Sequence, residues 1–232
     1  MRAVPGLFPL YFVSDHGLNA GRSKLEVIAA ALRGGARLIQ FRDKALDDAA
    51  FQAEAAAALQ LCRGHGATML VNDRAHIARE IGADGVHLGQ GDMPVPEARR
   101  LLGPEALIGL STHGEEEVRA ARDLPLTYIN IGPMFPTGTK EHAKALGSGE
   151  ALRLAGLWKG HWTTMGGIRL AHLPDLFRRG VKTAGMVTEI SLAENPERKT
   201  AEILALIGEI APTGDPVSAS GFPAPYPSSP GA

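Results

Sequence analysis

Charged and amide side chains follow several short apolar segments of the chain. In the first such group, Gln40, Arg42 and Lys44 alternate with Phe41 and Asp43. If this segment is a β-strand running into a loop, its period of two turns the amide and the two cations toward one side. Two cations and an amide that face the same way are suited to a polyphosphate. Ordinary surface charges at a strand end are the alternative interpretation.

Two aspartates follow the next two apolar segments. Asp73 lies in Asn72-Asp73-Arg74, and Asp92 ends Gly89-Gln90-Gly91-Asp92. Proteins usually hold Mg²⁺ with one or two carboxylates together with substrate phosphates and water. Asp73 and Asp92 could therefore hold this ion against a diphosphate. The alternative is that they cap the helices that follow, since Asp is a favoured N-cap residue.

Four later groups follow apolar segments, and the last three of them have the composition of phosphate-binding loops. Ser111 ends one apolar segment, and Thr137-Gly138-Thr139-Lys140 follows the next. Gly166-Gly167 and Val187-Thr188 end two further segments, where backbone N–H groups could bind a phosphate. A simple tight turn is the alternative for the glycine pair.

A scaffold must bring these groups to one place, and the sequence indicates which one. Eight short segments read as strands, namely residues 10–13, 38–41, 69–71, 85–88, 107–110, 128–131, 162–165 and 184–187. Helical patterns begin near Lys24, Asp48, His76, Val95, Glu115, Gly149, Leu173 and Pro196. Eight strand–helix pairs predict a (β/α)₈ barrel, whose active face lies at the carboxyl ends of the strands. An open doubly wound sheet is the alternative, but Ser14-Asp15-His16-Gly17 stands where its glycine-rich phosphate loop is expected.

Composition narrows the class of protein further. The chain has 24 basic and 25 acidic residues and a net charge of -1, so it has no overall field that would attract nucleic acid or an anionic membrane. Residues 1–9 lack the apolar stretch of a signal peptide, and no segment approaches the roughly 20 apolar residues of a membrane helix. The single cysteine, Cys62, permits no intramolecular disulfide and reads as a buried small hydrophobe. We expect a cytoplasmic protein that binds small phosphorylated molecules. The oligomeric state is not determined by the sequence.

The end of the chain differs in composition from the rest. Residues 212–232 contain six prolines among Ser, Gly and Ala, with Asp215 as the one charged residue. Such a segment cannot bury enough apolar surface to offset its ordering entropy. We therefore expect one barrel domain over residues 1–211 and a disordered tail over residues 212–232.

Taken together, five motifs closely resemble thiamine-phosphate synthases. They occur in order along the chain: Gln40-Phe41-Arg42-Asp43-Lys44, Val71-Asn72-Asp73-Arg74, Gly82-Ala83-Asp84-Gly85-Val86-His87-Leu88-Gly89-Gln90-Gly91-Asp92-Met93-Pro94, Ile108-Gly109-Leu110-Ser111-Thr112-His113 and Ile131-Gly132-Pro133-Met134-Phe135-Pro136-Thr137-Gly138-Thr139-Lys140. The resemblance implies a (β/α)₈ barrel transferase that joins 4-amino-5-hydroxymethyl-2-methylpyrimidine diphosphate to a thiazole phosphate, carboxylated or plain. The products are thiamine phosphate and pyrophosphate, and Mg²⁺ is required.

The resemblance also implies a role for each matching residue. The pyrimidine diphosphate would be held by Gln40, Arg42, Lys44, Asn72, Ser111 and Lys140, and Arg42, Lys44, Ser111 and Lys140 would act in catalysis. The metal would be held by Asp73 and Asp92. The thiazole phosphate would be held by Thr137, Thr139, Gly167, Val187 and Thr188. Pyrophosphate would leave first, and the thiazole nitrogen would capture the resulting pyrimidinylmethyl cation.

Two alternatives and one departure accompany the resemblance. A related thiazole tautomerase has a catalytic histidine after the glycine of the sixth strand, where this chain has Pro133, and it tends to lack the aspartate found here as Asp92. A non-catalytic barrel that binds phosphorylated ligands is the second alternative. Near the eighth strand, the usual Val-Ser-Ala-Ile is replaced by Val187-Thr188-Glu189-Ile190. We expect the Glu189 carboxylate to face away from the phosphate pocket.

Overall fold

The computed structural model describes residues 8–138 and 144–210. Thr139, Lys140 and residues 212–232 lie outside the described residues. The roles expected for those two side chains and for the proline-rich tail therefore stay predictions.

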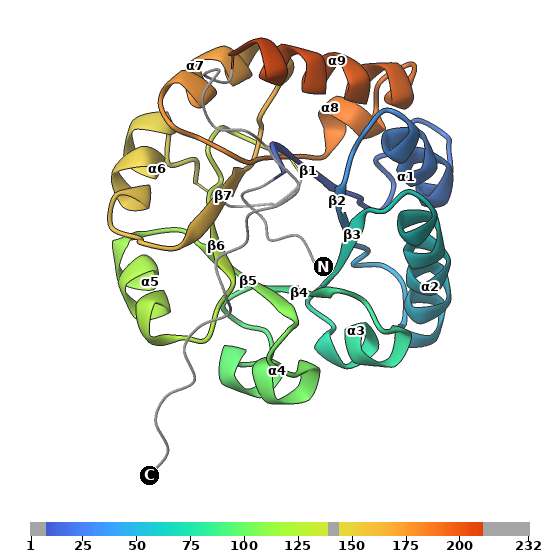
Figure 1. Ribbon diagram of the computed structural model, residues 1–232, viewed down its shortest axis with the longest axis horizontal. Helices are drawn as coiled ribbons and strands as arrows, with labels where there is room; N and C mark the ends of the chain where they lie inside the picture. Colours follow the sequence, from blue (N-terminus) through green and yellow to red (C-terminus); the bar gives the residue numbers. More distant parts are fainter. Residues whose placement is uncertain (1–7, 139–143, 211–232) are drawn as a thin grey trace.

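Eight parallel strands close into a barrel in chain order (Figure 1). The strands are β1 (Leu10–Val13), β2 (Leu38–Phe41), β3 (Thr68–Asn72), β4 (Gly85–Leu88), β5 (Leu107–Thr112), β6 (Tyr128–Ile131), β7 (His161–Met165) and β8 (Ala184–Met186). The last strand pairs with the first, with Leu10 opposite Ala184. The barrel prediction is confirmed, and the closed sheet rules out the open doubly wound alternative.

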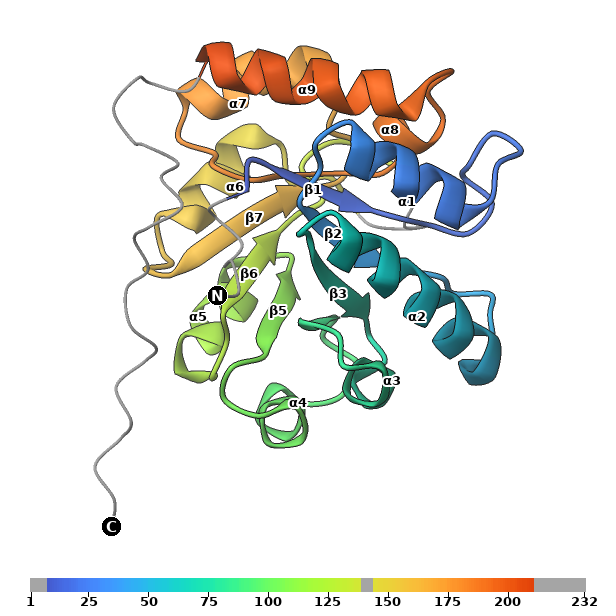
Figure 2. The same cartoon turned by 45° about the vertical axis from the view of Figure 1, so that its right-hand side comes forward.

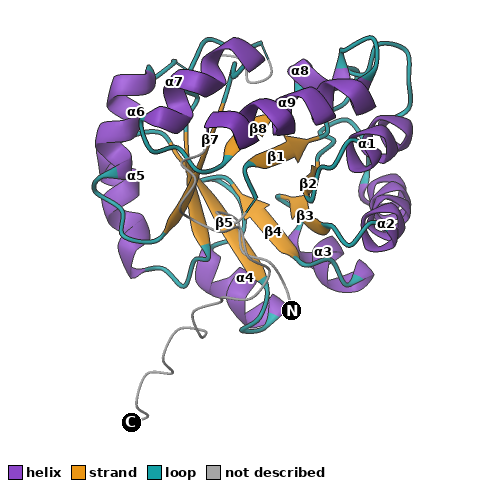
Figure 3. Ribbon diagram, turned by 45° about the horizontal axis from the view of Figure 1, so that its top comes forward, coloured by secondary structure: helices purple, strands orange, loops and turns teal. Residues whose placement is uncertain are grey.

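The helices form a layer around the strands (Figure 3). They are α1 (Lys24–Arg33), α2 (Asp48–Gly64), α3 (Ala75–Ile81), α4 (Val95–Leu102), α5 (Glu115–Ala120), α6 (Ser148–Ala155), α7 (Leu173–Arg178), α8 (Thr188–Ser191) and α9 (Pro196–Ile210), with short 3₁₀ turns η1 (Ala121–Asp123) and η2 (Leu170–His172). Figure 2 shows α9 lying alongside α7, α8 and α1. Among the described residues, no helix combines the length and apolar character needed to cross a bilayer.

Alternating strand residues build two separate hydrophobic cores. On β1, Leu10 and Phe12 belong to the large core between the strands and the helices. The intervening residues, Tyr11 and Val13, belong to a second core made of strand residues, together with Leu38, Leu70, Leu107 and Tyr128. This second core fills the barrel interior, as the period of two requires.

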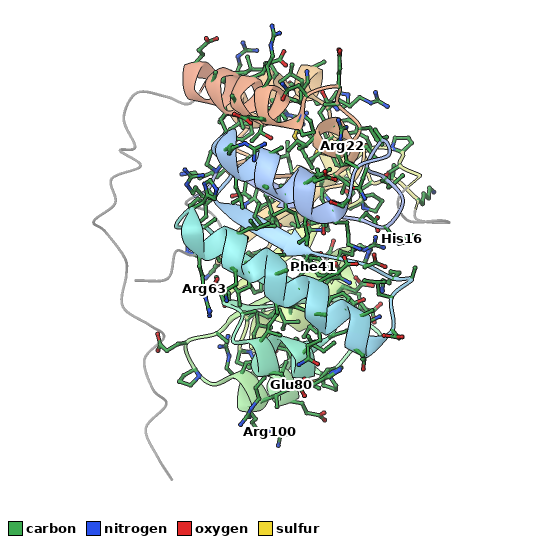
Figure 4. The ribbon with its side chains drawn as sticks, turned by 90° about the vertical axis from the view of Figure 1, so that its right-hand side faces the viewer. His16, Arg22, Phe41, Arg63, Glu80 and Arg100 are labelled. Atoms are coloured by element: carbon green, nitrogen blue, oxygen red, sulfur yellow. The ribbon has the colours of Figure 1, made fainter. Side chains whose placement is uncertain are left out.

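Local sequence explains why the helices begin where they do. Ser23 caps α1 by accepting a hydrogen bond from the Glu26 backbone N–H at 3.2 Å, and the Glu26 carboxylate accepts one from the Ser23 N–H at 2.8 Å. Asp47 caps α2 through the N–H of Ala50 at 2.8 Å. The two ends of the barrel are visible in Figure 4, where His16, in the loop after β1, lies far from Arg63, at the end of α2.

The predicted eighth strand is one residue too long, and the chain turns into α8 instead. Arg22 holds the far end of this helix, because its guanidinium donates to three carbonyl oxygens at the last residue of α8 and just after it. These are the carbonyls of Ser191 at 3.2 Å, Ala193 at 2.6 Å and Glu194 at 3.0 Å. A side chain from the loop after β1 thus satisfies backbone groups near the end of the barrel.

Candidate active site

A cavity of about 140 Å³ opens at the carboxyl ends of the strands. Of the thirteen site residues expected from the sequence, eleven line this cavity: Gln40, Arg42, Lys44, Asn72, Asp73, Asp92, Ser111, Thr137, Gly167, Val187 and Thr188. Thr139 and Lys140 are the two that lie outside the described residues. The side chains come from seven of the eight strand ends, so the parallel register of the barrel is what gathers them.

Both cations of the first motif are paired with carboxylates. The guanidinium of Arg42 contacts the carboxylate of Asp15, and the ammonium of Lys44 contacts that of Asp73. Burial raises the pKa of Asp15, an effect that the Arg42 charge opposes. Sequence reasoning missed both pairs because each one joins two different strand ends. A phosphate that binds either cation would therefore have to replace its carboxylate partner.

Asp73 and Asp92 form a carboxylate pair at the ends of β3 and β4. Burial and the neighbouring Asp73 carboxyl raise the pKa of Asp92. Burial opposes ionisation of Asp73, yet its hydrogen bonds with Lys44 and Asp92 lower its pKa. Asp73 also has a left-handed backbone, with φ of 61°, which Asp tolerates better than most residues.

The capping alternative for these two aspartates is wrong. The residues at the N-cap positions of α3 and α4 are Arg74 and Pro94, and neither makes a side-chain capping hydrogen bond. Asp92 instead accepts a hydrogen bond from the Gly89 N–H at 2.7 Å within its own loop. No group of three or more His, Cys, Asp or Glu suited to a metal occurs within residues 8–138 and 144–210. A convergent carboxylate pair fits a hard divalent cation that takes its other ligands from phosphate and water.

Two glycines, Gly166 and Gly167, line the cavity at the end of β7, away from the two aspartates. Gly167 has φ of 62°, and a Cβ there would lie 2.4 Å from the Pro136 carbonyl oxygen. Gly166 has φ of 100°, and a Cβ there would lie 2.4 Å from the Pro133 Cβ. The loop after β6 hydrogen-bonds along this turn, from the Phe135 N–H to the Gly166 carbonyl at 2.9 Å. The glycine pair is thus required by the close approach of two loops as well as by turn geometry.

Glu189 takes the orientation that we expected. Its carboxylate accepts a hydrogen bond from the Leu170 N–H at 3.3 Å. Among the described residues, those lining the cavity include its neighbours Val187 and Thr188 but not Glu189. The departure from the usual motif therefore places no carboxylate on the cavity wall.

Several polar residues in and beneath the cavity were missed by sequence reasoning. His87, His113 and Asn130 line the cavity, although the sequence offered no ligand spacing that marks the histidines. Beneath it, Tyr11 and Tyr128 are fully buried with their hydroxyl oxygens 3.0 Å apart. The period of two along the strands could have predicted two of these residues, because His87 and Asn130 occupy strand positions that face the barrel interior.

Fold and site together define a (β/α)₈-barrel protein whose polar cavity lies at the carboxyl ends of its strands. The family model described as thiamine monophosphate synthase matches residues 10–190. The chain belongs to this family.

Individual relatives agree with the family. The chain is 39% identical over 203 residues to a thiamine-phosphate synthase of Nostoc punctiforme, covering 88% of this chain and 57% of that protein. It is 38% identical over 193 residues to one from Persephonella marina, covering 82% and 92%. The thiamine phosphate pyrophosphorylase structure from Pyrococcus furiosus superposes with a TM-score of 0.81 at 28% identity, covering 88% of this chain and 98% of that one. The chain thus spans little more than half of the Nostoc protein and nearly all of the other two.

Proposed function

We propose that the protein joins 4-amino-5-hydroxymethyl-2-methylpyrimidine diphosphate to a thiazole phosphate, giving thiamine phosphate and pyrophosphate. The observation that carries the proposal is that eleven residues implied by the family resemblance, spread from Gln40 to Thr188, line one cavity. Family membership supports the same reaction. We assign the whole reaction to the barrel, because every one of these residues belongs to it.

The diphosphate half of the site suits a departing pyrophosphate. Bond cleavage with little nucleophilic push needs fixed positive charge near the leaving oxygens. Arg42 and Lys44 supply that charge once they exchange Asp15 and Asp73 for phosphate oxygens. No general base is needed, because the attacking thiazole nitrogen carries no proton to remove. The proposed reaction therefore uses no acid–base pair.

Asp73 and Asp92 would hold Mg²⁺, which would neutralise the growing negative charge of the pyrophosphate. Two observations support this assignment. The carboxylates of Asp73 and Asp92 converge, and the Asp73 carboxylate contacts the Lys44 ammonium, so positive charge is stabilised at this position. Thr137, Gly167, Val187 and Thr188 would hold the thiazole phosphate on the other side of the cavity. Glu189 faces away from that side, so its carboxylate would not repel the bound phosphate.

The test is a coupled assay of the wild-type protein with both substrates and Mg²⁺, measuring pyrophosphate and thiamine phosphate together. The carboxylated and the plain thiazole phosphate are supplied in parallel. We expect pyrophosphate and thiamine phosphate in equal amounts, with one CO₂ also released for each carboxylated thiazole phosphate that reacts. We also expect a loss of at least a hundredfold in turnover for Asp92→Asn. Asp123→Asn is the matched control, since Asp123 is exposed and lies in η1, away from the cavity.

The same assay separates the alternatives. Interconversion of thiazole isomers without pyrophosphate release would favour the tautomerase. Binding of both substrates without either product would favour a non-catalytic barrel. Equal turnover by the wild type and Asp92→Asn would contradict the metal assignment while leaving the reaction itself intact.

A further inference from the structure

A chain of buried hydrogen bonds runs beneath the cavity from Gln40 on β2 to Ser111 on β5. The Gln40 side-chain Nε2 donates to the Tyr11 hydroxyl at 2.6 Å, and the hydroxyls of Tyr11 and Tyr128 lie 3.0 Å apart. The Tyr128 hydroxyl lies 2.8 Å from His87 Nδ1, and His87 Nε2 lies 2.9 Å from the Ser111 hydroxyl. All five side chains are at most 4% exposed.

Proton counting gives this chain a single direction. Tyr11 accepts from Gln40, so its one hydroxyl proton is left for Tyr128. Tyr128 then accepts from Tyr11 and gives its own proton to His87 Nδ1. His87 therefore carries its proton on Nε2 and donates it to Ser111. With Gln40 donating to Tyr11, any other order leaves a buried hydroxyl proton without an acceptor, which is costly away from water.

Three features keep the middle of this hydrogen-bond chain in place. Burial raises the pKa of both Tyr11 and Tyr128 well above the usual value, so each stays a hydroxyl donor. Gly109 makes room for the Tyr128 ring, because a Cβ at position 109 would lie 2.1 Å from the ring carbon Cζ. The two tyrosine rings also meet edge to face, with centroids 6.3 Å apart.

The two ends of the chain face the cavity with opposite polarity. Gln40 lines the cavity, and with Nε2 committed to Tyr11, its Oε1 is the amide atom left to accept from a ligand. Ser111 also lines the cavity, and with its oxygen accepting from His87, its hydroxyl proton is left to donate. The opposite polarity requires the Gln40 amide to turn over and the three hydrogen bonds beyond Tyr11 to reverse as well.

We propose that Tyr11, Tyr128 and His87 form a proton-ordered relay that makes the site selective for a heteroaromatic ring offering an amino donor to Gln40 and a ring-nitrogen acceptor to Ser111. The proposal rests on the proposed function, whose aminopyrimidine has both groups. The three relay residues act through Gln40 and Ser111, so they are positioning residues. A 4-oxo ring in place of the 4-amino ring would set a lone pair against the Gln40 oxygen.

The first test reads the proton order without any ligand. Nitrogen chemical shifts of the histidines, with His87 assigned by comparison with His87→Gln, are expected to show a proton on Nε2 and a lone pair on Nδ1. In Tyr128→Phe, where Nδ1 loses its donor, we expect the two neutral forms to mix. A proton on Nδ1 of the wild type would overturn the relay, as would an unchanged spectrum in Tyr128→Phe.

The second test measures selectivity by calorimetric titration of 4-amino-5-hydroxymethyl-2-methylpyrimidine diphosphate and its 4-oxo analogue, with no thiazole phosphate present. We expect the wild type to prefer the amino compound at least tenfold. The preference should fall below threefold when Tyr11→Phe and Tyr128→Phe are combined, which severs Gln40 from His87. Thr200→Val is the control, since it removes a buried hydroxyl that donates to Pro196 in α9, far from the relay.

Each result of the titration bears on the proposal. A wild type without preference, or an unchanged preference in the double variant, would overturn the relay, whereas equal weakening of both compounds would show a purely structural role and also overturn it. If the double variant does not fold, Tyr11→Phe alone frees the Gln40 amide and should lower the preference. If neither compound binds the wild type while His87 carries its proton on Nε2, the proposed pyrimidine substrate fails and the proton order stands.

Discussion

Asp43 lies inside the first motif but faces away from the cavity, toward a buried lysine. Its carboxylate contacts the Lys24 ammonium, and it also accepts from the backbone N–H groups of Ala45 at 2.7 Å and Leu46 at 3.0 Å. Lys24 is 8% exposed and Asp43 is fully buried. Although burial opposes ionisation, these donors lower the pKa of Asp43 from 3.8 to about 2. We expect this carboxylate to stabilise the fold rather than to bind substrate.

The pKa gives the size and the sign of the effect. A shift of just under two pKa units corresponds to about 2 kcal/mol of folding free energy, at 1.36 kcal/mol per unit. Because the pKa is lowered on folding, this stabilisation is fully present above about pH 4 and is lost as the pH falls toward 2. Asp43→Asn should therefore lower the free energy of unfolding by about 2 to 3 kcal/mol at pH 7, since it also leaves the Lys24 ammonium with the half-exposed Glu54 carboxylate, at 2.9 Å, as its charge partner.

The measurement is urea unfolding of the wild type, Asp43→Asn and the exposed control Asp123→Asn at pH 7, 5, 4 and 3. The gap between the wild type and Asp43→Asn should be largest at pH 7 and should narrow between pH 4 and 3. Asp123→Asn should follow the wild type throughout. A variant as stable as the wild type at pH 7, or a gap that stays constant to pH 3, would refute the reasoning.

Three further outcomes are expected. Gly167→Ala should lower the melting temperature by roughly 5 °C or more, because it adds a Cβ at φ of 62° and 2.4 Å from the Pro136 oxygen, whereas Gly138→Ala, with open space around it, should be silent. Glu189→Ala should change the affinity for thiazole phosphate less than tenfold in a titration, because the carboxylate faces Leu170; a larger gain would place it in the pocket. Burial raises the pKa of the Cys62 thiol to about 12, so a thiol reagent at pH 8 should modify it in urea but not in the folded protein, and rapid modification without urea would contradict the burial.

Much of the fold could be predicted because its signals are local. All eight strands were located within two residues at either end, and the helices within one residue at their starts, since buried strand segments alternate with amphipathic helices. The four-residue helix α8 escaped prediction because it has no periodicity of its own and ends against Arg22, far away in the sequence. Strand patterns also predicted which residues meet at the cavity, because parallel strands deliver their carboxyl ends to one face.

The interactions among the site residues could not be predicted in the same way. The contact of Arg42 with Asp15 and that of Lys44 with Asp73 depend on which side chains face each other across the barrel. Tyr11 and Tyr128 read as ordinary apolar strand residues, and their hydroxyl contact depends on the space that Gly109 leaves. These contacts form only when the barrel closes and brings distant strands together, so no single segment of the sequence predicts them.

The first strand of the barrel acquires its second neighbour only when the last strand has been made. Leu10 can pair only after Ala184 has been synthesised, and the hydrogen bond from Arg22 to the Ala193 carbonyl joins residues 171 positions apart in the sequence. During synthesis on the ribosome, one edge of β1 therefore exposes unpaired N–H and C=O groups through almost the whole of translation. Such an edge can pair with other chains. Ribosome stalling before residues 184–186 would thus leave a nascent chain with two open edges, at β1 and β7, until β8 is made and pairs with both.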